Sequence, residues 1–409
     1  MVHKMLAAVD NPPIRLSLWD GREVTSPVDN PIATLQFFDR IAVLKAMFNP
    51  ELYFGDLYSS GRMDFNGDMT GFFEAIYRGL ASSTSRGFIH RLLLWLGRRR
   101  ITNSHARARD NIHHHYDIGN DFYQLWLDNE AMQYTCAYYP DPNMSLEDAQ
   151  LAKLHHICRK LQINPGDRIV EAGCGWGGLS LFMAKYYGAK VTAYNISKEQ
   201  VKYARDKAER EKLSGQVEYV LDDYRNITGM YDVFVSVGML EHVGKRDFPS
   251  MGKVINRCLA EEGRGLIHAI GRNYPRPLNA WIERRIFPGA YPPTLREMME
   301  IFEPFRFSVL DVENLRLHYA KTLKHWMQRF EQNADDIEAQ LDKAFVKAWR
   351  MYLAGSTAAF RVGELQLFQV VFTRSQNNHL PWSRAHLYSN ETDSDHRHQG
   401  QWNDTSTAT

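Results

Sequence analysis

A glycine-rich segment near the middle of the chain has the composition of a ligand-binding turn. The order Glu171-Ala172-Gly173-Cys174-Gly175-Trp176-Gly177-Gly178 follows the apolar residues 169–170 and precedes the helical pattern of residues 179–184. A strand, a tight turn and a helix are therefore predicted in succession. Because glycine lacks a Cβ atom, the backbone can turn sharply there and approach a bound molecule closely. The segment predicts a site for a cofactor that contains a nucleoside.

Polar residues that follow the next two predicted strands narrow the choice of cofactor. A nicotinamide enzyme usually has an acidic residue at the end of the second strand, whereas this chain has Asn195, with Gln200 shortly after it. Both amides can bond a ribose, though less tightly than a carboxylate. The third strand ends at Asp222-Asp223-Tyr224-Arg225, where a carboxylate and an aromatic ring can hold an adenine. This combination favours S-adenosylmethionine over a dinucleotide, and three ordinary polar loops are the alternative.

Two further residues are candidates for catalysis. Glu241 follows the fourth predicted strand, at the edge of the sheet where substrates meet the cofactor in doubly wound folds. His268 lies in the apolar strand of residues 266–270, beside that edge. A lone histidine in a strand is more often a hydrogen-bonded core residue, and this alternative stays open. We expect both side chains to lie near the reacting atoms.

The region before the glycine turn contains three adjacent histidines and an aromatic segment. His113, His114 and His115 point in different directions along any regular element, so they make a poor chelating set and no metal site is expected. The later segment Gln133-Tyr134-Thr135-Cys136-Ala137-Tyr138-Tyr139 packs aromatic residues around a small polar pair. Because an aromatic face attracts a cation, this segment suits a lid over a sulfonium cofactor.

Strands and helices alternate from residue 167 onward. Strands are predicted over residues 168–172, 190–195, 217–221, 231–237 and 265–270, with helices over residues 178–187, 198–212 and 249–258. Two further strands, residues 306–313 and 366–373, flank a long helical region. The alternation predicts an α/β fold with a doubly wound, Rossmann-like parallel sheet. Its strand ends gather the candidate residues at one edge.

The chain is expected to divide into three parts. We predict a smaller α+β domain with its own core, serving as a lipid-binding or accessory domain, over residues 1–105, a domain that carries the chemistry over residues 106–375, and a disordered, polar tail over residues 376–409. Residues 86–109 interleave arginines with apolar and aromatic side chains. Such a stretch can lie on an anionic membrane surface. An ordinary interdomain helix with solvated arginines is the alternative.

Composition excludes several classes of protein. The 409 residues are 44% hydrophobic and carry a net charge of +1, which suits a sizeable core and argues against a whole-protein nucleic-acid binder. No apolar run is long enough to cross a bilayer, and the N-terminus lacks a signal-peptide core. The cysteines show no paired spacing, which favours a reduced, cytoplasmic protein. They are Cys136, Cys158, Cys174 and Cys258.

The chain resembles the cyclopropane-fatty-acyl-phospholipid synthases and the related mycolic acid cyclopropane synthases, which are class I S-adenosylmethionine-dependent methyltransferases. The N-terminal region looks like the extra domain of the longer members, which act on phospholipids. The matching motifs cover residues 109–374 and have high joint specificity. They are His115-Tyr116-Asp117, residues 133–138, residues 171–177, residues 196–200, Glu241-His242-Val243-Gly244 and residues 318–323.

The resemblance implies a reaction at a cis double bond of an unsaturated phospholipid acyl chain. S-adenosylmethionine supplies the methyl group, and loss of a proton from the resulting carbocation closes a cyclopropane ring. The site must exclude water, which would trap the cation, and it must hold a base near the new methyl group. In the family this base is a bound bicarbonate ion.

Carried over by motif, the resemblance implies two sets of site residues. The bicarbonate pocket is formed by Cys136, Glu241, His268, Ile270 and Tyr319. Glu241 suits a site for an anion if it accepts the hydroxyl proton of bicarbonate and orients the ion together with His268. No metal is implied. The expected S-adenosylmethionine residues are Tyr134, Thr135, Gly173, Cys174, Gly175, Asn195, Gln200, Tyr224 and Arg225.

Three positions depart from the family's pattern. Thr135 stands where serine is common and Asn195 where threonine is common, and both keep a polar group. Ser356 stands where the family usually has a cysteine once regarded as a nucleophile, so Ser356 is left outside the predicted site. The segment Trp281–Gly289 mixes apolar and cationic side chains. We expect it to close over an acyl chain, with a plain surface helix as the alternative.

Other functions remain open on the sequence alone. The same fold suits an enzyme that makes branched-methyl lipids or methylates the amine of a small molecule, and a non-catalytic lipid-binding protein is a third possibility. The set of Cys136, Glu241, His268 and Tyr319 favours deprotonation of a cation over N-methylation. The expected partner is unsaturated phospholipid at the membrane surface, with no nucleic acid. We expect a homodimer in the cytoplasm, peripherally associated with the inner face of the membrane.

Overall fold

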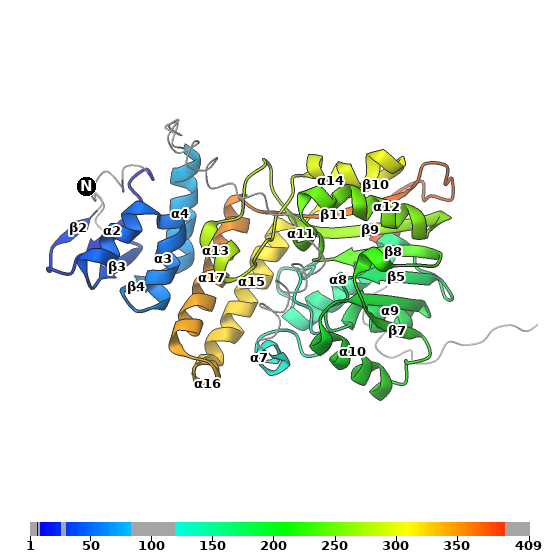
Figure 1. Ribbon diagram of the computed structural model, residues 1–409, viewed down its shortest axis with the longest axis horizontal. Coiled ribbons are helices and arrows are strands. Elements are labelled where there is room, and N and C mark those ends of the chain that lie inside the picture. Colours follow the sequence, from blue (N-terminus) through cyan, green and yellow to red (C-terminus); the bar gives the residue numbers. More distant parts are fainter. Residues whose placement is uncertain (1–5, 7–8, 26–29, 83–118, 389–409) are drawn as a thin grey trace, which may run out of the picture.

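The computed structural model describes residue 6 and residues 9–25, 30–82 and 119–388. These residues form a seven-stranded sheet and a four-stranded sheet, with a group of helices between them (Figure 1). The basic segment of residues 86–109, the adjacent histidines and the motif His115-Tyr116-Asp117 lie outside the described residues.

The seven-stranded sheet confirms the predicted doubly wound α/β fold. Its strand order is β10-β11-β9-β8-β5-β6-β7. The strands from β9 to β7 run parallel, and β11 and β10 extend the sheet beside β9 as antiparallel strands. The bounds are β5 Arg168–Ala172, β6 Lys190–Asn195, β7 Val217–Leu221, β8 Tyr231–Val237, β9 Leu259–Gly271, β10 Phe307–Asn314 and β11 Gln366–Arg374.

Helices cover both faces of this sheet (Figure 1). Val233 and Val235 of β8 belong to one buried cluster, and Phe234 between them belongs to another on the opposite face. Because both faces are covered, β8 carries consecutive buried apolar residues, Val233, Phe234 and Val235, rather than an alternating pattern. One face carries α8 Leu146–Leu161, α9 Gly178–Tyr187 and α10 Lys198–Arg210, and the other carries α12 Phe248–Cys258 and α14 Leu295–Phe302.

The predicted bounds differ from the structure by more than one residue at two places. The helix expected over residues 198–212 ends at Arg210, and Lys212 adopts the left-handed region with a φ of 60°. The strand expected over residues 265–270 begins earlier, at Leu259, because the chain continues beside β8 through a register shift. Neither difference moves a candidate site residue.

The N-terminal unit has the predicted α+β character. Its four-stranded sheet has the order β2-β1-β3-β4. The Asp39 carboxylate accepts from the Ala42 N–H at the start of α2 and also from the Arg62 guanidinium, which ties this helix to β4. The bounds are β1 Ile14–Ser17, β2 Glu23–Thr25, β3 Ala33–Phe37, α2 Arg40–Phe48, α3 Pro50–Ser59, β4 Met63–Gly67 and α4 Met69–Ser82.

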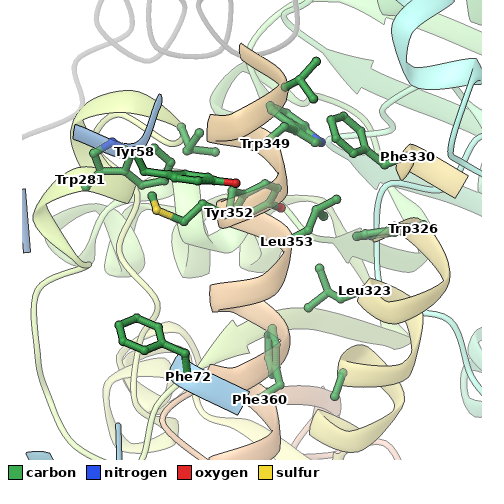
Figure 2. Close-up of a cluster of buried hydrophobic side chains, with 14 of the residues drawn as sticks. Tyr58, Phe72, Trp281, Leu323, Trp326, Phe330, Trp349, Tyr352, Leu353 and Phe360 are labelled. Atoms are coloured by element: carbon green, nitrogen blue, oxygen red, sulfur yellow. The ribbon is translucent and has the colours of Figure 1, made fainter. Parts of the chain in front are cut away.

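The core of the N-terminal unit is not separate, contrary to the sequence prediction. Helix α17, Lys343–Val362, lies between α3 and α4 on one side and α15, Arg316–Gln332, on the other (Figure 1). Figure 2 shows Tyr58 and Phe72 on one side of α17 and Trp326 on the other, within one hydrophobic cluster. The N-terminal unit is therefore packed onto the helices that border the main sheet. The remaining α-helices of the described ranges are α7 Asn120–Gln124, α11 Leu240–Val243, α13 Ala280–Arg285 and α16 Ala334–Gln340.

The described chain after β11 is anchored at two positions, although most of its residues are exposed. Nδ2 of Asn377 donates to the carbonyl oxygen of Glu262 and to Oγ1 of Thr373, each across 2.9 Å, and Leu387 is buried. The predicted start of the tail at residue 376 therefore lies in a segment that Asn377 bonds to β9 and β11. Within the described part of the chain, none of the helices combines the length and the apolar content needed to cross a bilayer.

Candidate active site

The glycine turn between β5 and α9 has a backbone that glycine adopts with little strain. Gly173, Gly175 and Gly177 have φ angles of 82°, 53° and 80°, which other residues rarely take. A Cβ atom on Gly173 would lie 2.9 Å from the side chain of Met239. The N–H groups of Gly173 and Cys174 donate to the Tyr194 carbonyl oxygen across 2.9 and 3.1 Å. The turn is thereby fixed against the end of β6.

Two adjoining pockets open beside this turn, and we call the pair the cofactor cavity. The first is lined by the glycine turn, the aromatic segment and residues after β6 and β8. The second is lined by residues after β6 and β7, and it shares Gly173, Asn195, Met239 and His242 with the first. The structure brings together in this cavity every residue predicted for the cofactor. They are Tyr134, Thr135, Gly173, Cys174, Gly175, Asn195, Gln200, Tyr224 and Arg225.

Asn195 connects three walls of the cofactor cavity. Its Nδ2 donates to the Gly175 carbonyl oxygen across 3.0 Å and to Oε1 of Gln200 across 2.9 Å. Its Oδ1 accepts from the Ser197 N–H across 3.1 Å, and Oγ of Ser197 accepts from the Gln200 N–H at the start of α10. The amide therefore sets the position of the glycine turn relative to β6 and α10.

Tyr224 and Arg225 form the far wall of the cofactor cavity. The Arg225 guanidinium donates to both carboxylate oxygens of Asp223, across 2.8 and 2.7 Å, and lies 5.7 Å from the centre of the Tyr224 ring. Asp223 neutralises Arg225, so these two residues add polar edges beside the aromatic face of Tyr224, and the Asp222 carboxylate also lines this pocket. Such a wall suits an uncharged heterocycle such as adenine.

A buried lysine that the sequence analysis did not select supports the segment carrying Tyr134. Nζ of Lys153 on α8 donates to Oγ1 of Thr135 across 2.9 Å and to Oε1 of Gln133. Nε2 of Gln150 donates to the Thr135 carbonyl oxygen across 2.9 Å. Burial lowers the pKa of Lys153 to about 8. The sequence feature that could have indicated this role is a lysine among the buried residues of α8.

Glu171 is a second buried group that the predicted site residues omit. It is the penultimate residue of β5, just before the glycine turn, and it lines the cofactor cavity and accepts from Oγ of Ser180. Burial raises the pKa of Glu171 to about 7. Its place at the head of the glycine motif was visible in the sequence, whereas its pairing with Ser180 was not.

A mainly apolar cavity adjoins the cofactor cavity, and we call it the reaction cavity. Tyr134, Thr135, Gly238 and His242 line both cavities. The reaction cavity contains every residue predicted for the bicarbonate pocket, namely Cys136, Glu241, His268, Ile270 and Tyr319. Much of its remaining wall is hydrophobic and consists of Leu278, Ile282, Phe287, Leu323, Phe360, Leu365 and Leu367.

Glu241 reaches the reaction cavity from the short helix α11, which follows β8. Its Oε1 accepts from the Ile270 N–H across 2.5 Å, so the carboxylate is fixed against the end of β9. Its Oε2 has no hydrogen-bond partner among the described residues. Burial raises the pKa of Glu241 to about 7. The carboxylate therefore offers one buried oxygen atom that can accept a hydrogen bond from a bound molecule.

His268 is placed beside Glu241 by the neighbouring strand β9. Its side chain is buried, and Nε2 has no hydrogen-bond partner within the described part of the chain. Burial holds the pKa of His268 well below its usual range, so the imidazole is neutral near pH 7. A neutral imidazole has one nitrogen that donates and one that accepts.

The segment containing Cys136 is held against α15, which carries Tyr319. The Ala137 N–H donates to Oγ1 of Thr322 across 3.0 Å, and the Tyr139 N–H donates to Nδ1 of His318 across 2.9 Å. Burial raises the pKa of the Cys136 thiol, so this group remains protonated. These contacts explain why two segments far apart in the sequence contribute to one cavity.

Helix α17 adds two polar residues that were not predicted for the site. Tyr352 and Ser356, one helical turn apart, both line the reaction cavity, and the Tyr352 hydroxyl lies 3.0 Å from the Tyr134 hydroxyl. Ser356 is not among the site residues predicted from the sequence, because it stands where the family usually has a cysteine. Ser356 nevertheless lines the reaction cavity, because α17 places this position on the cavity wall whichever side chain it carries.

The segment of residues 281–289 forms a wall rather than a free surface helix. Ile282 and Phe287 line the reaction cavity. Arg285 donates to both oxygen atoms of Asp56 on α3, each across 2.9 Å, and Trp281 is buried. The segment therefore lies between the reaction cavity and the N-terminal unit.

Comparison with protein-family models identifies two regions of the chain. The model described as "Mycolic acid cyclopropane synthetase" matches residues 103–370, which is more than half of the chain. A second model, described as a domain of unknown function, matches residues 1–86.

Individual relatives agree with the family match. The chain is 35% identical over 388 residues to a "Probable fatty acid methyltransferase" of Pseudomonas putida, covering 92% of this chain and 96% of that one. It is 35% identical over 362 residues to the "Cyclopropane-fatty-acyl-phospholipid synthase" of Escherichia coli K12, covering 88% and 91%. A crystal structure of mycolic acid cyclopropane synthase CmaA1, complexed with SAH and CTAB, has a TM-score of 0.62 and 26% identity, covering 68% of this chain and all of that chain.

Proposed function

The chain belongs to the mycolic acid cyclopropane synthetase family, and on this premise we propose that it converts a cis double bond of a phospholipid acyl chain into a cyclopropane ring. S-adenosylmethionine is the donor of the added carbon. One observation carries the proposal. A buried acceptor atom of Glu241 and a buried ring nitrogen of His268 belong to the wall of an apolar cavity that adjoins the cofactor cavity.

The residues of the cofactor cavity fit S-adenosylmethionine. Asn195 and Gln200 supply polar groups for a ribose, and Tyr224 supplies an aromatic face for an adenine. Tyr134 lies where the cofactor cavity meets the reaction cavity, and an aromatic ring there can stabilise a sulfonium group. The similar CmaA1 structure holds SAH, the demethylated product of this cofactor.

The apolar wall of the reaction cavity fits an acyl chain and the chemistry of its double bond. In the proposed reaction, the π electron pair forms a bond to the methyl carbon while the carbon–sulfur bond breaks and its electrons stay on sulfur. The other alkene carbon becomes a cation. Loss of a proton from the new methyl group then gives the electron pair that closes the ring. Side chains such as Leu278, Ile282 and Phe287 exclude the water that would trap the cation.

The polar residues of the reaction cavity fit a bicarbonate ion. When bound there, bicarbonate supplies the base that removes the methyl proton. Oε2 of Glu241 can accept the hydroxyl proton of the ion, and Nε2 of His268 can donate to one of its negatively charged oxygen atoms. Cys136 and Tyr319 complete the pocket. The side chains thus hold and orient the ion rather than remove the proton themselves.

We propose further that the protein meets its substrate at the surface of a bilayer. Helix α2 of the N-terminal unit presents Ile41, Leu44 and Phe48 with 58%, 50% and 86% of their surface exposed. These residues are three and four positions apart, so they lie on one face of the helix. Contact with the bilayer would cover this apolar face while an acyl chain passes to the reaction cavity.

Lipid analysis of a cell that lacks ring fatty acids tests the proposal. Expression of this protein should add CH2 to unsaturated phospholipid acyl chains with loss of the double bond. Expression of the Glu241→Gln variant at the same level is the control and should leave most acyl chains unchanged. A product that carries two further hydrogen atoms would identify a branched-methyl lipid instead. A methylated amine with unchanged acyl chains would identify a small-molecule methyltransferase.

A further inference from the structure

Gln369 contacts the side chain of His268 from the adjacent strand. Strands β9 and β11 are antiparallel, and the register pairs Gln369 with His268. Both side chains are buried, with 0% and 1% exposed. Nε2 of Gln369 lies 3.1 Å from Nδ1 of His268. A buried amide is costly unless it is bonded, and Nε2 has this contact with His268, whereas Oε1 of Gln369 has no hydrogen-bond partner among the described residues.

We infer that Gln369 is a positioning residue that holds His268 in the tautomer with its proton on Nε2. A carboxamide nitrogen donates hydrogen bonds and does not accept them. In the orientation of the Gln369 amide that the structure shows, Nδ1 of His268 accepts from Nε2 of Gln369 and carries no proton. The single proton of the neutral ring is then on Nε2, on the side of the ring away from Gln369.

The neighbourhood of His268 keeps the ring neutral, so the choice of tautomer matters. Burial lowers the pKa of His268 first of all. The charges of Lys153 and Lys160 lower it further, and Glu313 acts in the opposite direction. A doubly protonated ring would donate from both nitrogens, whereas the neutral ring donates only from the nitrogen that Gln369 leaves protonated.

The consequence for catalysis rests on the proposed function. Nε2 of His268 and Oε2 of Glu241 both lack hydrogen-bond partners among the described residues, and both residues line the reaction cavity. With the proton on Nε2, they offer a donor and an acceptor, which complements the negatively charged oxygen and the hydroxyl group of bicarbonate. With the proton on Nδ1, Nε2 of His268 and Oε2 of Glu241 would both be acceptors. Nε2 would then face a negatively charged oxygen atom of bicarbonate without a proton to donate.

Nitrogen NMR of the ¹⁵N-histidine-labelled protein tests the tautomer directly. The spectrum of His268→Gln identifies the His268 signals among those of the 16 histidines. We expect the Nδ1 signal of an unprotonated nitrogen and the Nε2 signal of a protonated one. In Gln369→Glu, the carboxylate accepts from the ring and should move the proton to Nδ1. A protonated Nδ1 in the unmodified protein would overturn the inference.

The bicarbonate dependence of turnover tests the consequence. Gln369→Leu should raise the bicarbonate concentration for half-maximal rate about tenfold, the cost of one misplaced hydrogen bond to a charged group. Its affinity for S-adenosylmethionine should not change. Gln366→Leu is the matched control, because Gln366 is a buried amide of the same strand that bonds Gly363 and Asn314. An unchanged bicarbonate dependence in Gln369→Leu would contradict a positioning role.

Failure of this inference can be told apart from failure of the proposed function. A protein that transfers no methyl group to phospholipid contradicts the proposed function, and its nitrogen spectrum still reports the tautomer of His268. Conversely, a ring-forming enzyme whose His268 carries its proton on Nδ1 retains the proposed function and loses the role of Gln369. The spectrum of the unmodified protein requires no substitution at position 369. It therefore reports the tautomer of His268 even if a variant at that position does not fold.

Discussion

The side-chain amide of Asn195 donates to the carbonyl oxygen of Gly175 across 3.0 Å, which ties the end of β6 to the glycine turn. The same Nδ2 atom also donates to Gln200 on α10. The position of the turn therefore depends on a side chain that follows a different strand. This contact makes the shape of the cofactor cavity sensitive to a single residue outside the glycine motif.

Asn195→Ala should weaken binding of S-adenosylmethionine about tenfold, because it would remove the proposed ribose contact and leaves the Gly175 carbonyl oxygen without its donor. Isothermal titration calorimetry measures the dissociation constant. Asn143→Ala is the control, since Asn143 is exposed on a distant turn. Equal affinity in Asn195→Ala and the unmodified protein would exclude Asn195 from the cofactor site.

Glu241→Gln should separate cofactor binding from turnover. The amide keeps the size of the side chain but replaces an acceptor oxygen with a donor, so bicarbonate would be held poorly. We expect kcat to fall by about 100-fold or more, as for loss of general base catalysis. The dissociation constant of S-adenosylmethionine should stay within about twofold of the value for the unmodified protein. A twofold change corresponds to less free energy than one hydrogen bond contributes. Undiminished kcat would remove Glu241 from the mechanism.

The same variant should change how stability depends on pH. Burial raises the pKa of Glu241 to about 7 from 4.5. The folded protein therefore binds this proton more tightly than the unfolded chain does, and stability falls as the pH rises from 4.5 to about 7. At about pH 8, Glu241→Gln should gain about 3 kcal/mol in free energy of unfolding relative to the unmodified protein, and almost none at about pH 4.

Urea unfolding at several pH values measures this difference. Glu218→Gln, a substitution of an exposed carboxylate on β7, is the control and should follow the unmodified protein throughout. A difference between Glu241→Gln and the unmodified protein that does not vary with pH would show that Glu241 is not buried as an acid of raised pKa.

The exposed face of α2 should contribute to membrane binding. The double variant Leu44→Ser, Phe48→Ser should bind phospholipid vesicles at least about tenfold more weakly, because insertion of two large apolar side chains contributes more than 1.4 kcal/mol. Its activity on detergent-dispersed phospholipid should remain. The control Val309→Ser, Leu310→Ser changes two partly exposed apolar residues of β10. Vesicle sedimentation that does not distinguish these variants would exclude α2 from the contact.

Much of the fold could be predicted from the sequence, because strands, helices and turns are encoded in patterns of neighbouring residues. The apolar strands from β5 to β8 and the helices between them were predicted closely, since burial on both faces gives continuous apolar runs and glycine marks the turn after β5. The parallel arrangement then requires Glu241 and the glycine turn to lie at one edge of the sheet. The gathering of the predicted cofactor residues in one cavity agrees with that reasoning.

Other parts of the site depend on contacts between distant segments, which no local pattern reveals. Tyr352 approaches Tyr134 across 218 positions of the sequence, and Gln369 approaches His268 across 101. Lys153 gave a weak signal as a lysine on an apolar helix face, but its bonds to Gln133 and Thr135 follow only from the packing of α8. The shared core around α17 likewise depends on the placement of the N-terminal unit.

The central claim is that the added methyl carbon loses a proton as it closes a ring. The most direct measurement supplies the purified protein with S-adenosylmethionine carrying a CD3 group, bicarbonate and vesicles of a cis-unsaturated phospholipid, followed by mass spectrometry of the acyl chains. Ring formation predicts a product that has gained CD2, has lost its double bond and has released one deuteron. An acyl chain that retains all three deuterium atoms, or one that gains no carbon, would contradict the claim.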